Sequence, residues 1–359
     1  MKNLNKLKFS AIFVMVAIYI ASCSKAPAPV PALTPNLSYN LNFYTLNQGA
    51  FGSGNASVSF YNAKTKTITQ DIFKATNNRP LGDVAQSMVN FGNQYYIVVN
   101  NSGKTEVVNA STFLSTGTIT GLNQPRYFLG RDSSTGYITQ WGANGMTGSV
   151  AVVNLKTNQV TTTISTGMGA EGMVLVGNNL YVACNGGFGS DSVLSIINAQ
   201  TNVLQQNIVV GANPQGIQLD ANGKLWVLCQ GQYNTNYTSL VKPAQLVRIN
   251  PANNSIECTY TFSSSTTQPS NLIINSQKNT LNYIYNGGVY AQSISANTLS
   301  TAPLIRESFY GVNVDPGNYI FGGNAGNGTN PGWAVRYDQS GTRYDSVQVG
   351  IFPVGFCFQ

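Results

Sequence analysis

The chain has 359 residues, only 9% of them charged, and a formal net charge of +7 at pH 7. Such a sparsely charged sequence lacks the basic stripe that nucleic-acid binding requires, so nucleic acid is not an expected partner. It also contains no histidine, which removes Ser-His-Asp and Cys-His catalysis, imidazole metal ligands and the usual general base at neutral pH.

Residues 1–22 are predicted to be an export signal. Three lysines precede an apolar run that is too short to span a membrane comfortably, and the run ends in Ile20-Ala21-Ser22-Cys23. This ending resembles the lipobox of bacterial lipoproteins. The resemblance implies that Cys23 becomes the lipidated first residue of the mature protein. The alternative is an ordinary secretory signal in which Cys23 occurs by chance.

Residues 23–40 are predicted to be a tether that begins at the lipidated cysteine. They include the run Ala-Pro-Ala-Pro-Val-Pro-Ala. Alternating proline and alanine favours an extended polyproline conformation, a semi-rigid spacer of about 3 Å per residue. The tether is expected to hold the following domain away from the membrane.

Residues 41–359 contain a short apolar strand that recurs seven times, at intervals of about 40 to 55 residues. The recurring triads are Gln86-Ser87-Met88, Arg126-Tyr127-Phe128, Glu171-Gly172-Met173, Gln215-Gly216-Ile217, Ser270-Asn271-Leu272, Tyr310-Gly311-Val312 and Val354-Gly355-Phe356. Small residues are common in these triads, as expected where strands converge near one axis. The period predicts an all-β, seven-bladed β-propeller with four antiparallel strands per blade.

A second repeated feature gives the same count. Seven turns begin with Asn, Asp or Ser, whose side chain can accept a hydrogen bond from the backbone two residues later. They start at Asn62, Asn109, Asn154, Asn198, Asn250, Ser295 and Asp338.

The two ends of residues 41–359 are expected to share one blade. Residues 351–359 read as an inner strand with nothing after it, whereas residues 41–47, 56–61 and 67–73 read as the three strands that lack one. The C-terminal strand is therefore predicted to join the N-terminal blade and close the ring, which removes a free sheet edge.

Long loops between second and third strands indicate a working face. They carry aromatic residues among Asn and Gln, namely Phe51, Trp141, Phe188, Tyr233, Tyr237 and Trp333. Aromatic rings supply contact area and amides supply uncharged donors and acceptors, which suits a neutral polar ligand such as a glycan or a large cofactor-like molecule. The alternative is that these rings cap the blades or stack between loops.

Four residues that lead into inner strands are expected near the mouth of the central channel: Arg126, Glu171, Gln215 and Tyr310. Arg126 and Glu171 belong to neighbouring repeats and can pair. Either they form a structural ion pair, or they clamp a ligand carboxylate or amide.

The sequence contains no convincing metal, cofactor or catalytic constellation. Apart from Cys23, the cysteines are scattered and occupy small apolar positions, so buried thiols are favoured over a disulfide. The acidic residues lie mostly in turns and form no spaced calcium loop. No cofactor, no metal and no enzymatic activity are therefore expected.

Several segments carry a resemblance to a known group. They include Leu46-Asn47-Gln48-Gly49, Arg79-Pro80-Leu81-Gly82-Asp83 and Gly187-Phe188-Gly189-Ser190-Asp191-Ser192. They resemble the YncE/YVTN-type propeller lipoproteins over roughly residues 41–359, and within that group the chain is similar to the BtuG-type cobalamin-capture surface lipoproteins. The resemblance implies an outer-membrane lipoprotein, monomeric and attached only by its lipid, that captures a ligand for a TonB-dependent outer-membrane transporter.

Three functions remain open from the sequence. The first is a lipid-anchored extracytoplasmic protein that binds cobalamin or another neutral ligand, including a glycan. The second is a protein-interaction or adhesion scaffold, because broad loop faces also suit protein partners. The third is a propeller enzyme of the lactonase or lyase type. Because Ser24-Lys25 replaces the acidic stretch of many surface-exported lipoproteins, both the cell surface and a periplasm-facing anchor remain open.

Overall fold

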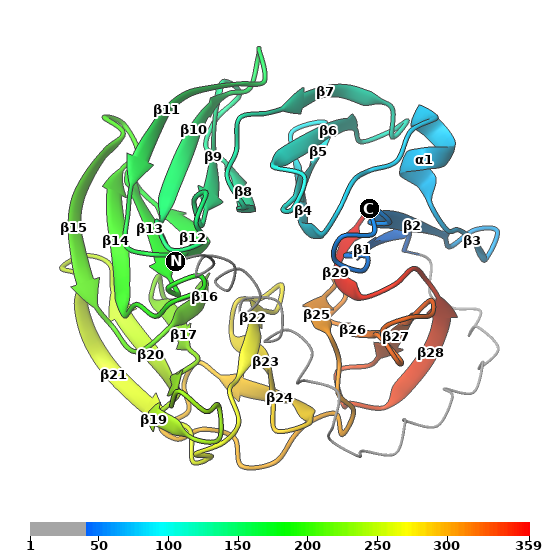
Figure 1. Ribbon diagram of the computed structural model, residues 1–359. Coiled ribbons are helices and arrows are strands. Elements are labelled where there is room, and N and C mark those ends of the chain that lie inside the picture. The colour runs from blue at the N-terminus through cyan, green and yellow to red at the C-terminus, as the bar shows by residue number, and fades with distance from the viewer. Residues whose placement is uncertain (1–40) are drawn as a thin grey trace, which may run out of the picture. The chain divides into compact units, whose positions relative to one another are not determined.

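The computed structural model describes residues 41–359, which form a ring of seven small antiparallel β-sheets around a central axis (Figure 1). Each of these sheets is one blade, and one edge strand of each blade, called the inner strand, lies next to the axis. Strands dominate, and the described residues include a single helix, α1 (Ile72–Asn77). The predicted seven-bladed propeller is confirmed. The predicted export signal, Cys23 and the tether lie outside the described residues.

Each blade is built outward from the axis, one strand after another. In that order, blade 1 contains β29 (Pro353–Phe358), β1 (Phe43–Asn47), β2 (Ser57–Asn62) and β3 (Thr67–Thr69). Blade 2 contains β4 (Ala85–Phe91), β5 (Gln94–Val99), β6 (Lys104–Asn109) and β7 (Ser115–Ile119). Blade 3 contains β8 (Pro125–Gly130), β9 (Thr135–Gln140), β10 (Ser149–Asn154) and β11 (Gln159–Ser165). Blade 4 contains β12 (Ala170–Val176), β13 (Asn179–Cys184), β14 (Val193–Asn198) and β15 (Val203–Val209).

Blade 5 contains β16 (Pro214–Leu219), β17 (Leu225–Cys229), β20 (Gln245–Asn250) and β21 (Ser255–Thr261). Blade 6 contains β22 (Ser270–Ile274), β23 (Thr280–Tyr285) and β24 (Gly288–Ser293). Blade 7 contains β25 (Gly311–Val314), β26 (Ile320–Asn324), β27 (Trp333–Tyr337) and β28 (Arg343–Gln348).

Blade 6 departs from the four-strand pattern at its outer edge. Its sheet has three strands, and an isolated bridge between Val289 and Ile305 stands where a fourth strand would pair. Pro303 lies in the same segment and has no backbone N–H to donate to a ladder. The pairing is therefore reduced to one bridge.

The first blade also differs from its predicted outline. The sequence predicts one strand over residues 67–73, but β3 ends at Thr69 and α1 begins at Ile72. The side chain of Asp71 accepts a hydrogen bond from the backbone N–H of Lys74 at 3.1 Å, which caps the helix. This cap favours one turn of helix over a longer strand.

The chain ends close the ring as predicted. β29 pairs antiparallel with β1, and Phe358 lies opposite Phe43 in the register. The backbone N–H of Gln359 also donates to the Asn42 carbonyl at 3.1 Å. The Phe43 ring packs against Phe321 of blade 7, with centroids 5.0 Å apart, so aromatic rings meet at the seam between the first and last blades.

The core lies between neighbouring blades, because each sheet buries both of its faces against the next. Tyr96 of blade 2 stacks on Phe128 of blade 3, with ring centroids 3.8 Å apart. Trp226 of blade 5 is fully buried in a cluster that includes Leu281 of blade 6. Full burial of one such side chain contributes roughly 1.5–3 kcal/mol to stability.

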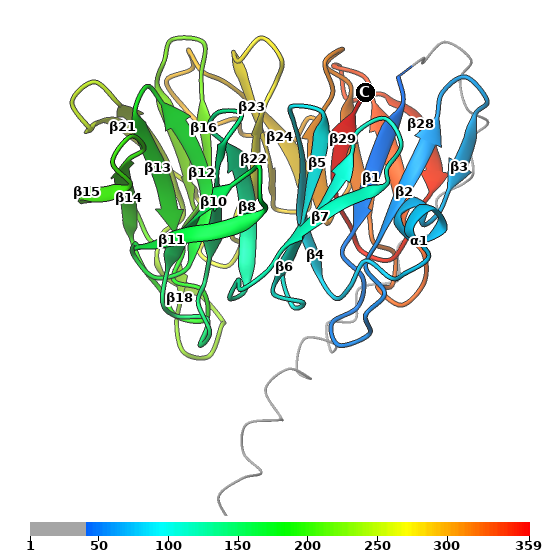
Figure 2. The same ribbon diagram turned by 90° about the horizontal axis from the view of Figure 1, so that it is seen from above.

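Two kinds of connection distinguish the faces of the ring. On one face, short turns begin with an Asn or Asp side chain that accepts from the backbone; Asn109, for example, accepts from Ser111 at 2.9 Å. On the other, the loops between second and third strands are longer. One of them carries the hairpin β18 (Gln232–Tyr233) and β19 (Leu240–Lys242). Figure 2 shows β18 and the loop after β1 projecting from the same side, called below the loop face.

Within residues 41–359, the one helix lacks the length and apolar character that crossing a membrane requires.

Candidate ligand-binding site

A cleft of about 680 Å³ opens on the loop face over blades 3, 4 and 5. Four of the predicted aromatic residues line it: Trp141 after β9, Phe188 after β13, and Tyr233 and Tyr237 between β17 and β20. Its volume falls within the range of roughly 300–1,000 Å³ that small-molecule sites occupy. The structure therefore gathers these four rings around one space.

Trp141 and Phe188 form one wall of this cleft. Their rings meet edge to face, with centroids 5.6 Å apart. The backbone N–H of Phe188 donates to the Gly145 carbonyl at 2.8 Å, which ties the two loops together. Phe188 remains 70% exposed, so its ring is available for contact.

Tyr233 and Tyr237 form the opposite wall. Their ring centroids lie 6.0 Å apart, and the Tyr233 hydroxyl donates to the Thr266 carbonyl at 2.7 Å. Tyr237 is 67% exposed and stands at the tip of the β18–β19 hairpin with a positive φ. The hairpin thus presents one anchored ring and one exposed ring.

Arg126 lines the cleft and forms a bidentate ion pair with Glu171, which is buried and is not part of the lining. The Arg126 Nε and Nη2 atoms donate to the two Glu171 oxygens, each at 2.8 Å, and the Glu171 side chain is fully buried. The Trp141 indole N–H donates to the same carboxylate at 2.7 Å, and the Arg126 guanidinium lies 4.1 Å from the Trp141 ring centre. Burial alone would lower the pKa of Arg126, but Glu171 raises it, so Arg126 stays charged.

The geometry of the Arg126–Glu171 pair distinguishes its two interpretations, a structural ion pair and a ligand clamp. Both Glu171 oxygens are engaged by Arg126 and Trp141, so the carboxylate has structural partners. The third guanidinium nitrogen of Arg126, Nη1, takes no part in the pair. The pair is therefore structural through Glu171 and leaves one donor on Arg126.

Amide side chains complete the cleft, and most of them brace its loops. Asn213 and Gln268 both donate to the Gly231 carbonyl, at 2.9 and 3.1 Å, and Gln230 donates to the Pro269 carbonyl at 3.3 Å. Gln215 differs, because its side-chain amide makes no hydrogen bond with any described residue and its Oε1 atom is buried.

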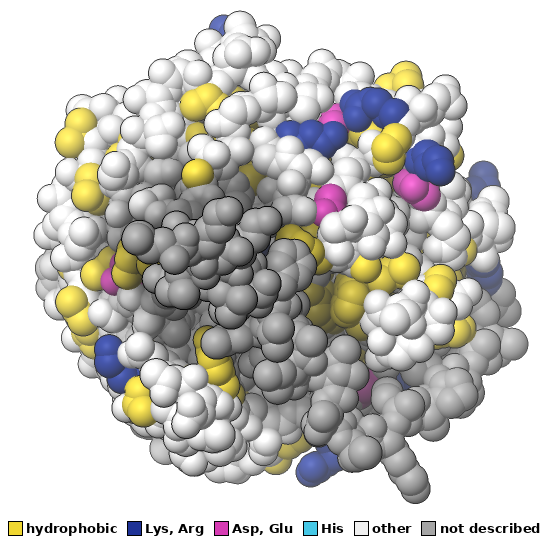
Figure 3. Space-filling model, viewed as in Figure 1, with side chains coloured by type: hydrophobic (Ala, Val, Ile, Leu, Met, Phe, Trp, Pro, Cys, Tyr) yellow, Lys and Arg dark blue, Asp and Glu magenta, His cyan; other side chains and the backbone are white. Residues whose placement is uncertain are grey.

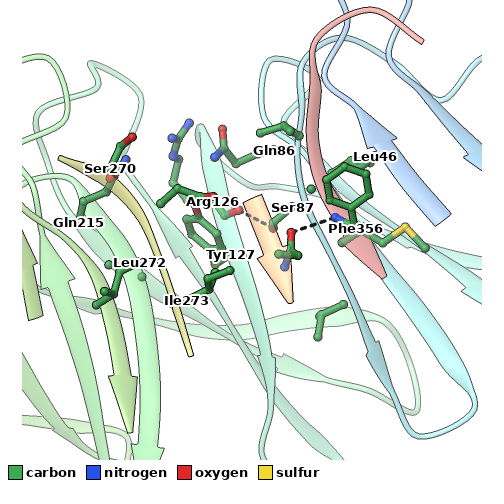
Figure 4. Close-up of a pocket in the computed structure, with 18 of the residues that line it drawn as sticks. Leu46, Gln86, Ser87, Arg126, Tyr127, Gln215, Ser270, Leu272, Ile273 and Phe356 are labelled. Atoms are coloured by element: carbon green, nitrogen blue, oxygen red, sulfur yellow. Dashed lines mark hydrogen bonds between the residues drawn. The ribbon is translucent and has the colours of Figure 1, made fainter. Parts of the chain in front are cut away.

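A second cavity, of about 600 Å³, runs along the axis between the inner strands. Arg126 and Gln215 line both this channel and the cleft. Figure 4 shows Arg126, Gln215 and Ser270 toward one end of the channel, with Leu272 and Ile273 further along it. The channel thus has a polar end where it meets the cleft, and beyond it apolar side chains alternate with amides such as Gln218 and Asn313.

Tyr310 lies at the channel, as expected, but its hydroxyl is engaged. It donates to the Gln48 side chain, and its ring lies 5.0 Å from that of Phe352. Burial raises the pKa of Tyr310, so the hydroxyl stays protonated at neutral pH. Tyr310 therefore contributes an edge of the channel and not a free polar group.

Two predicted residues lie apart from both cavities. Phe51 is 80% exposed on the loop between β1 and β2. Trp333 begins β27 and packs against the apolar cluster between blades 6 and 7, which includes Val289 and Val335. Trp333 thus has the capping position that the sequence left as an alternative.

Tyr127 is a channel residue that the sequence analysis did not single out. It faces the axis on β8, and burial together with nearby Glu171 raises its pKa to about 12. A signal was present, because Tyr127 holds the middle position of its triad. Four of the other six triads have Gly there, and Ser87 and Asn271 hold the remaining two.

The described cysteines are thiols. Cys184 and Cys229 are buried and Cys258 and Cys357 are partly buried, and none is in a disulfide. Burial raises the pKa of Cys184 to about 11 and that of Cys357 to about 12. Within residues 41–359, no three His, Cys, Asp or Glu side chains are grouped closely enough to hold a metal ion.

Both cavities are close to electrically neutral. Among the described residues that line them, Arg126 is the only charged one, and Glu171 balances it. Figure 3 shows the face turned toward the viewer of Figure 1, where charged side chains are scattered among uncharged ones. The site can therefore offer ring contacts and hydrogen bonds without a net field.

Several solved structures share this fold at low sequence identity. A quinonprotein alcohol dehydrogenase-like protein from Bacteroides thetaiotaomicron matches with a TM-score of 0.67 and 12% identity, over 89% of this chain and 78% of that one. A candidate 6-phosphogluconolactonase from Bacteroides fragilis matches with a TM-score of 0.61 and 12% identity, over 91% and 100%. AztD from Citrobacter koseri, in its apo form, matches with a TM-score of 0.55 and 9% identity, over 89% and 97%.

At these identities the likeness extends to the fold alone. No curated protein matches the sequence. Residues 42–359, which include every strand of the ring and both cavities, match the domain of unknown function DUF5074. The chain therefore belongs to the DUF5074 family.

Proposed function

We propose that this protein is a lipid-anchored extracytoplasmic binding protein that captures an uncharged polar ligand on the loop face of its propeller. The observation that carries the proposal is the cleft over blades 3 to 5. There, four aromatic rings surround about 680 Å³ of space whose only charged lining residue among those described, Arg126, is neutralised by Glu171.

The composition of the cleft favours binding over chemistry. Trp141, Phe188, Tyr233 and Tyr237 offer flat apolar contact, and amides supply donors and acceptors. Glu171, the carboxylate that Arg126 and Trp141 bind, is occupied by these two partners. A glycan or a cofactor-like molecule such as cobalamin matches this environment.

The cellular setting of the proposal rests on the sequence. A lipobox-like ending at Cys23 and a proline-rich tether suit a propeller held at the outer membrane, on the cell surface or facing the periplasm. A protein of this kind would pass its ligand to an outer-membrane transporter of the TonB-dependent class.

The test is a calorimetric titration of residues 36–359, which contain the complete closed ring. Cobalamin is titrated first and a panel of neutral glycans second. The expected result is saturable, one-to-one binding of one of them. If no ligand in either set produces heat at micromolar concentrations, ligand capture is contradicted. The hypothesis of a protein-interaction scaffold is then favoured.

Two phenylalanines provide a matched control. Phe188 in the cleft and Phe51 outside it are exposed to similar extents, 70% and 80%. Phe188→Ala should weaken binding about tenfold, since it removes an aromatic contact, and Phe51→Ala should leave it unchanged. Both variants should melt close to the parent. Equal effects of the two changes would place the ligand elsewhere.

A further inference from the structure

The cleft and the axial channel meet at two side chains, Arg126 and Gln215, which line both. They belong to nearby parts of the ring, because Arg126 lies on β8 of blade 3 and Gln215 on β16 of blade 5. Any ligand that occupies the cleft and reaches toward the axis must pass them. Their hydrogen-bonding groups therefore decide what can sit at the junction.

Arg126 has one donor to spare. Its Nε and Nη2 atoms are fixed on Glu171, and its guanidinium plane lies against Trp141, which holds the side chain in place. Nη1 donates to no described residue, and the Arg126 side chain, which is 12% exposed, lines both cavities. The junction thus contains a rigid, oriented N–H donor.

Gln215 contributes an entire amide without a protein partner. No described residue exchanges a hydrogen bond with its side chain, and its Oε1 atom is buried beside the cavities. The other amides named in this cleft, those of Asn213, Gln230 and Gln268, all brace backbone carbonyls. Because buried polar groups normally find partners, the Gln215 amide is available to a ligand group at this place.

The balance between the charges of Arg126 and Glu171 restricts the charge of the ligand group that can bind at the junction. Arg126 would attract an anion if it stood alone, but Glu171 neutralises it at 2.8 Å, and the described lining residues of both cavities include no other charge. A carboxylate would lose its hydration without gaining a net positive partner. An uncharged group that both accepts and donates would satisfy Arg126 and Gln215 together.

We infer that Arg126 and Gln215 form an anchor for an uncharged hydrogen-bonding group of the ligand that is both acceptor and donor, of the primary-amide or sugar-hydroxyl kind. The group accepts from Arg126 Nη1 and exchanges a hydrogen bond with the Gln215 amide. This inference rests on the proposed function and specifies the ligand chemistry at the junction. The remainder of the ligand lies against the rings of the cleft or extends into the channel.

The test uses small fluorinated probes and residues 36–359, followed by ¹⁹F NMR titration. The amide arm compares 4-fluorobenzamide, which donates and accepts, with 4-fluoro-N,N-dimethylbenzamide, which only accepts, and 4-fluorobenzoate, which is charged. The hydroxyl arm uses 4-fluorophenyl β-glucoside. The parent should bind 4-fluorobenzamide or the glucoside about three- to tenfold more tightly than the dimethylamide and the benzoate, as one net hydrogen bond predicts.

Two variants test whether the preference for 4-fluorobenzamide or the glucoside depends on Gln215. Gln215→Leu removes the amide at similar size and should reduce the ratio of affinities to about one. Gln206→Leu makes the same change on the exposed outer strand β15 and should leave the ratio unchanged. If Gln215→Leu does not fold, Gln215→Asn, which withdraws the amide by one methylene, should reduce the preference in its place.

Three results would overturn the anchor: equal binding of the probes by the parent, tightest binding of the benzoate, or a preference that survives in Gln215→Leu. Absence of binding by both the benzamide and the glucoside would overturn it as well. These outcomes reject the anchor without rejecting the proposed function. Binding of cobalamin or a glycan that depends on Phe188 but not on Gln215 would retain ligand capture and reject the anchor.

Discussion

Trp141 has a double role at the cleft, because its ring faces the ligand space and its indole N–H donates to buried Glu171. Trp141→Ala should weaken ligand binding about tenfold through the lost ring contact. It should also lower the free energy of unfolding by about 1–2 kcal/mol, since Glu171 loses a donor. Calorimetric titration with the ligand and urea unfolding measure the two effects.

Trp333 serves as a control for Trp141, because it is a tryptophan that lines neither cavity. It packs against the cluster between blades 6 and 7 and lies outside both cavities. Trp333→Ala should cost about 2 kcal/mol of stability, because it removes a half-buried ring from that cluster, and should leave affinity unchanged. Weakened binding in a stable Trp333→Ala protein would show that the ligand extends over blade 7.

Glu106 on β6 is 1% exposed and receives hydrogen bonds from Arg79 at 2.8 and 2.9 Å and from Lys104 at 2.6 Å. Burial raises its pKa, but these two cations lower it more, so its pKa in the folded protein lies below the usual value. Such a carboxyl stabilises the fold at pH values above its unfolded pKa, about 4.3. That stabilisation is lost as the pH falls through the folded pKa.

The free energy of unfolding is therefore expected to decrease from about pH 5 downward, and Glu106→Gln should flatten part of that slope. At pH 7 the substitution should cost about 2 kcal/mol, since charged hydrogen bonds become neutral ones. Urea unfolding of both proteins between pH 3 and 7 checks this. Parallel curves for the two would mean that other carboxylates carry the acid sensitivity.

Among the elements, the inner strands β25 and β29 approach each other closely, and Gly311 on β25 shows why a side chain is excluded there. A Cβ atom at Gly311 would lie 2.0 Å from the Val354 carbonyl oxygen of β29, whereas one at Gly355, also on β29, would be 3.7 Å from its nearest neighbour. Gly311→Ala should lower stability by about 2–3 kcal/mol because the strands must separate. Gly355→Ala should change it by less than about 1 kcal/mol.

Thermal or urea unfolding of these two alanine variants provides the measurement. They add the same methyl group to neighbouring inner strands, so glycine's backbone entropy affects both alike. Similar losses in the two would indicate that contact between β25 and β29 is not what keeps the axis narrow.

The elements that the sequence predicted well are those set by local pattern. Inner triads such as Glu171-Gly172-Met173 place a small residue before an apolar one. Turns such as the one at Asn198 form a hydrogen bond within three residues, because the Asn198 side chain accepts from the backbone N–H of Gln200 at 2.8 Å. Neither needs a partner far along the chain. Where a capping residue or a proline intervened, as at Asp71 and Pro303, the predicted strand was shortened or replaced.

The site was only partly predictable because loop residues are placed by the ring and not by their own sequence. Trp141 and Phe188 meet since the loops of blades 3 and 4 are adjacent. Trp333 was predicted in a similar loop, but it begins strand β27 and packs beside Val335 in the cluster between blades 6 and 7. The pairing of Arg126 with Glu171 could be predicted from their neighbouring repeats. The unpartnered amide of Gln215 could not, because it depends on what its neighbours bind.

At the scale of the whole molecule, the ring depends on its last strand. β29 pairs with β1 and packs on β25, and Phe356 lies within 5.4 Å of Phe321 between ring centroids. A chain that ends at residue 350 would expose the edge of β1 and the aromatic rings at the seam beside it. Such a chain should lose the cooperative transition and aggregate, since an unpaired edge recruits other strands.

A circular permutant separates loss of the strand from loss of the terminus. The Gln359 backbone N–H bonds to the Asn42 carbonyl, so a short glycine-rich turn can join residue 359 to residue 41 and place residues 351–359 first in the chain. This permutant should melt cooperatively within a few degrees of the parent, whereas the truncated chain should not, as followed by circular dichroism and scanning calorimetry. A truncated chain that stays soluble and melts like the parent would show that five four-stranded blades and two three-stranded ones, blades 1 and 6, hold the ring without closure. The cleft over blades 3 to 5 would then persist without β29, and ligand binding by the truncated chain would detect it.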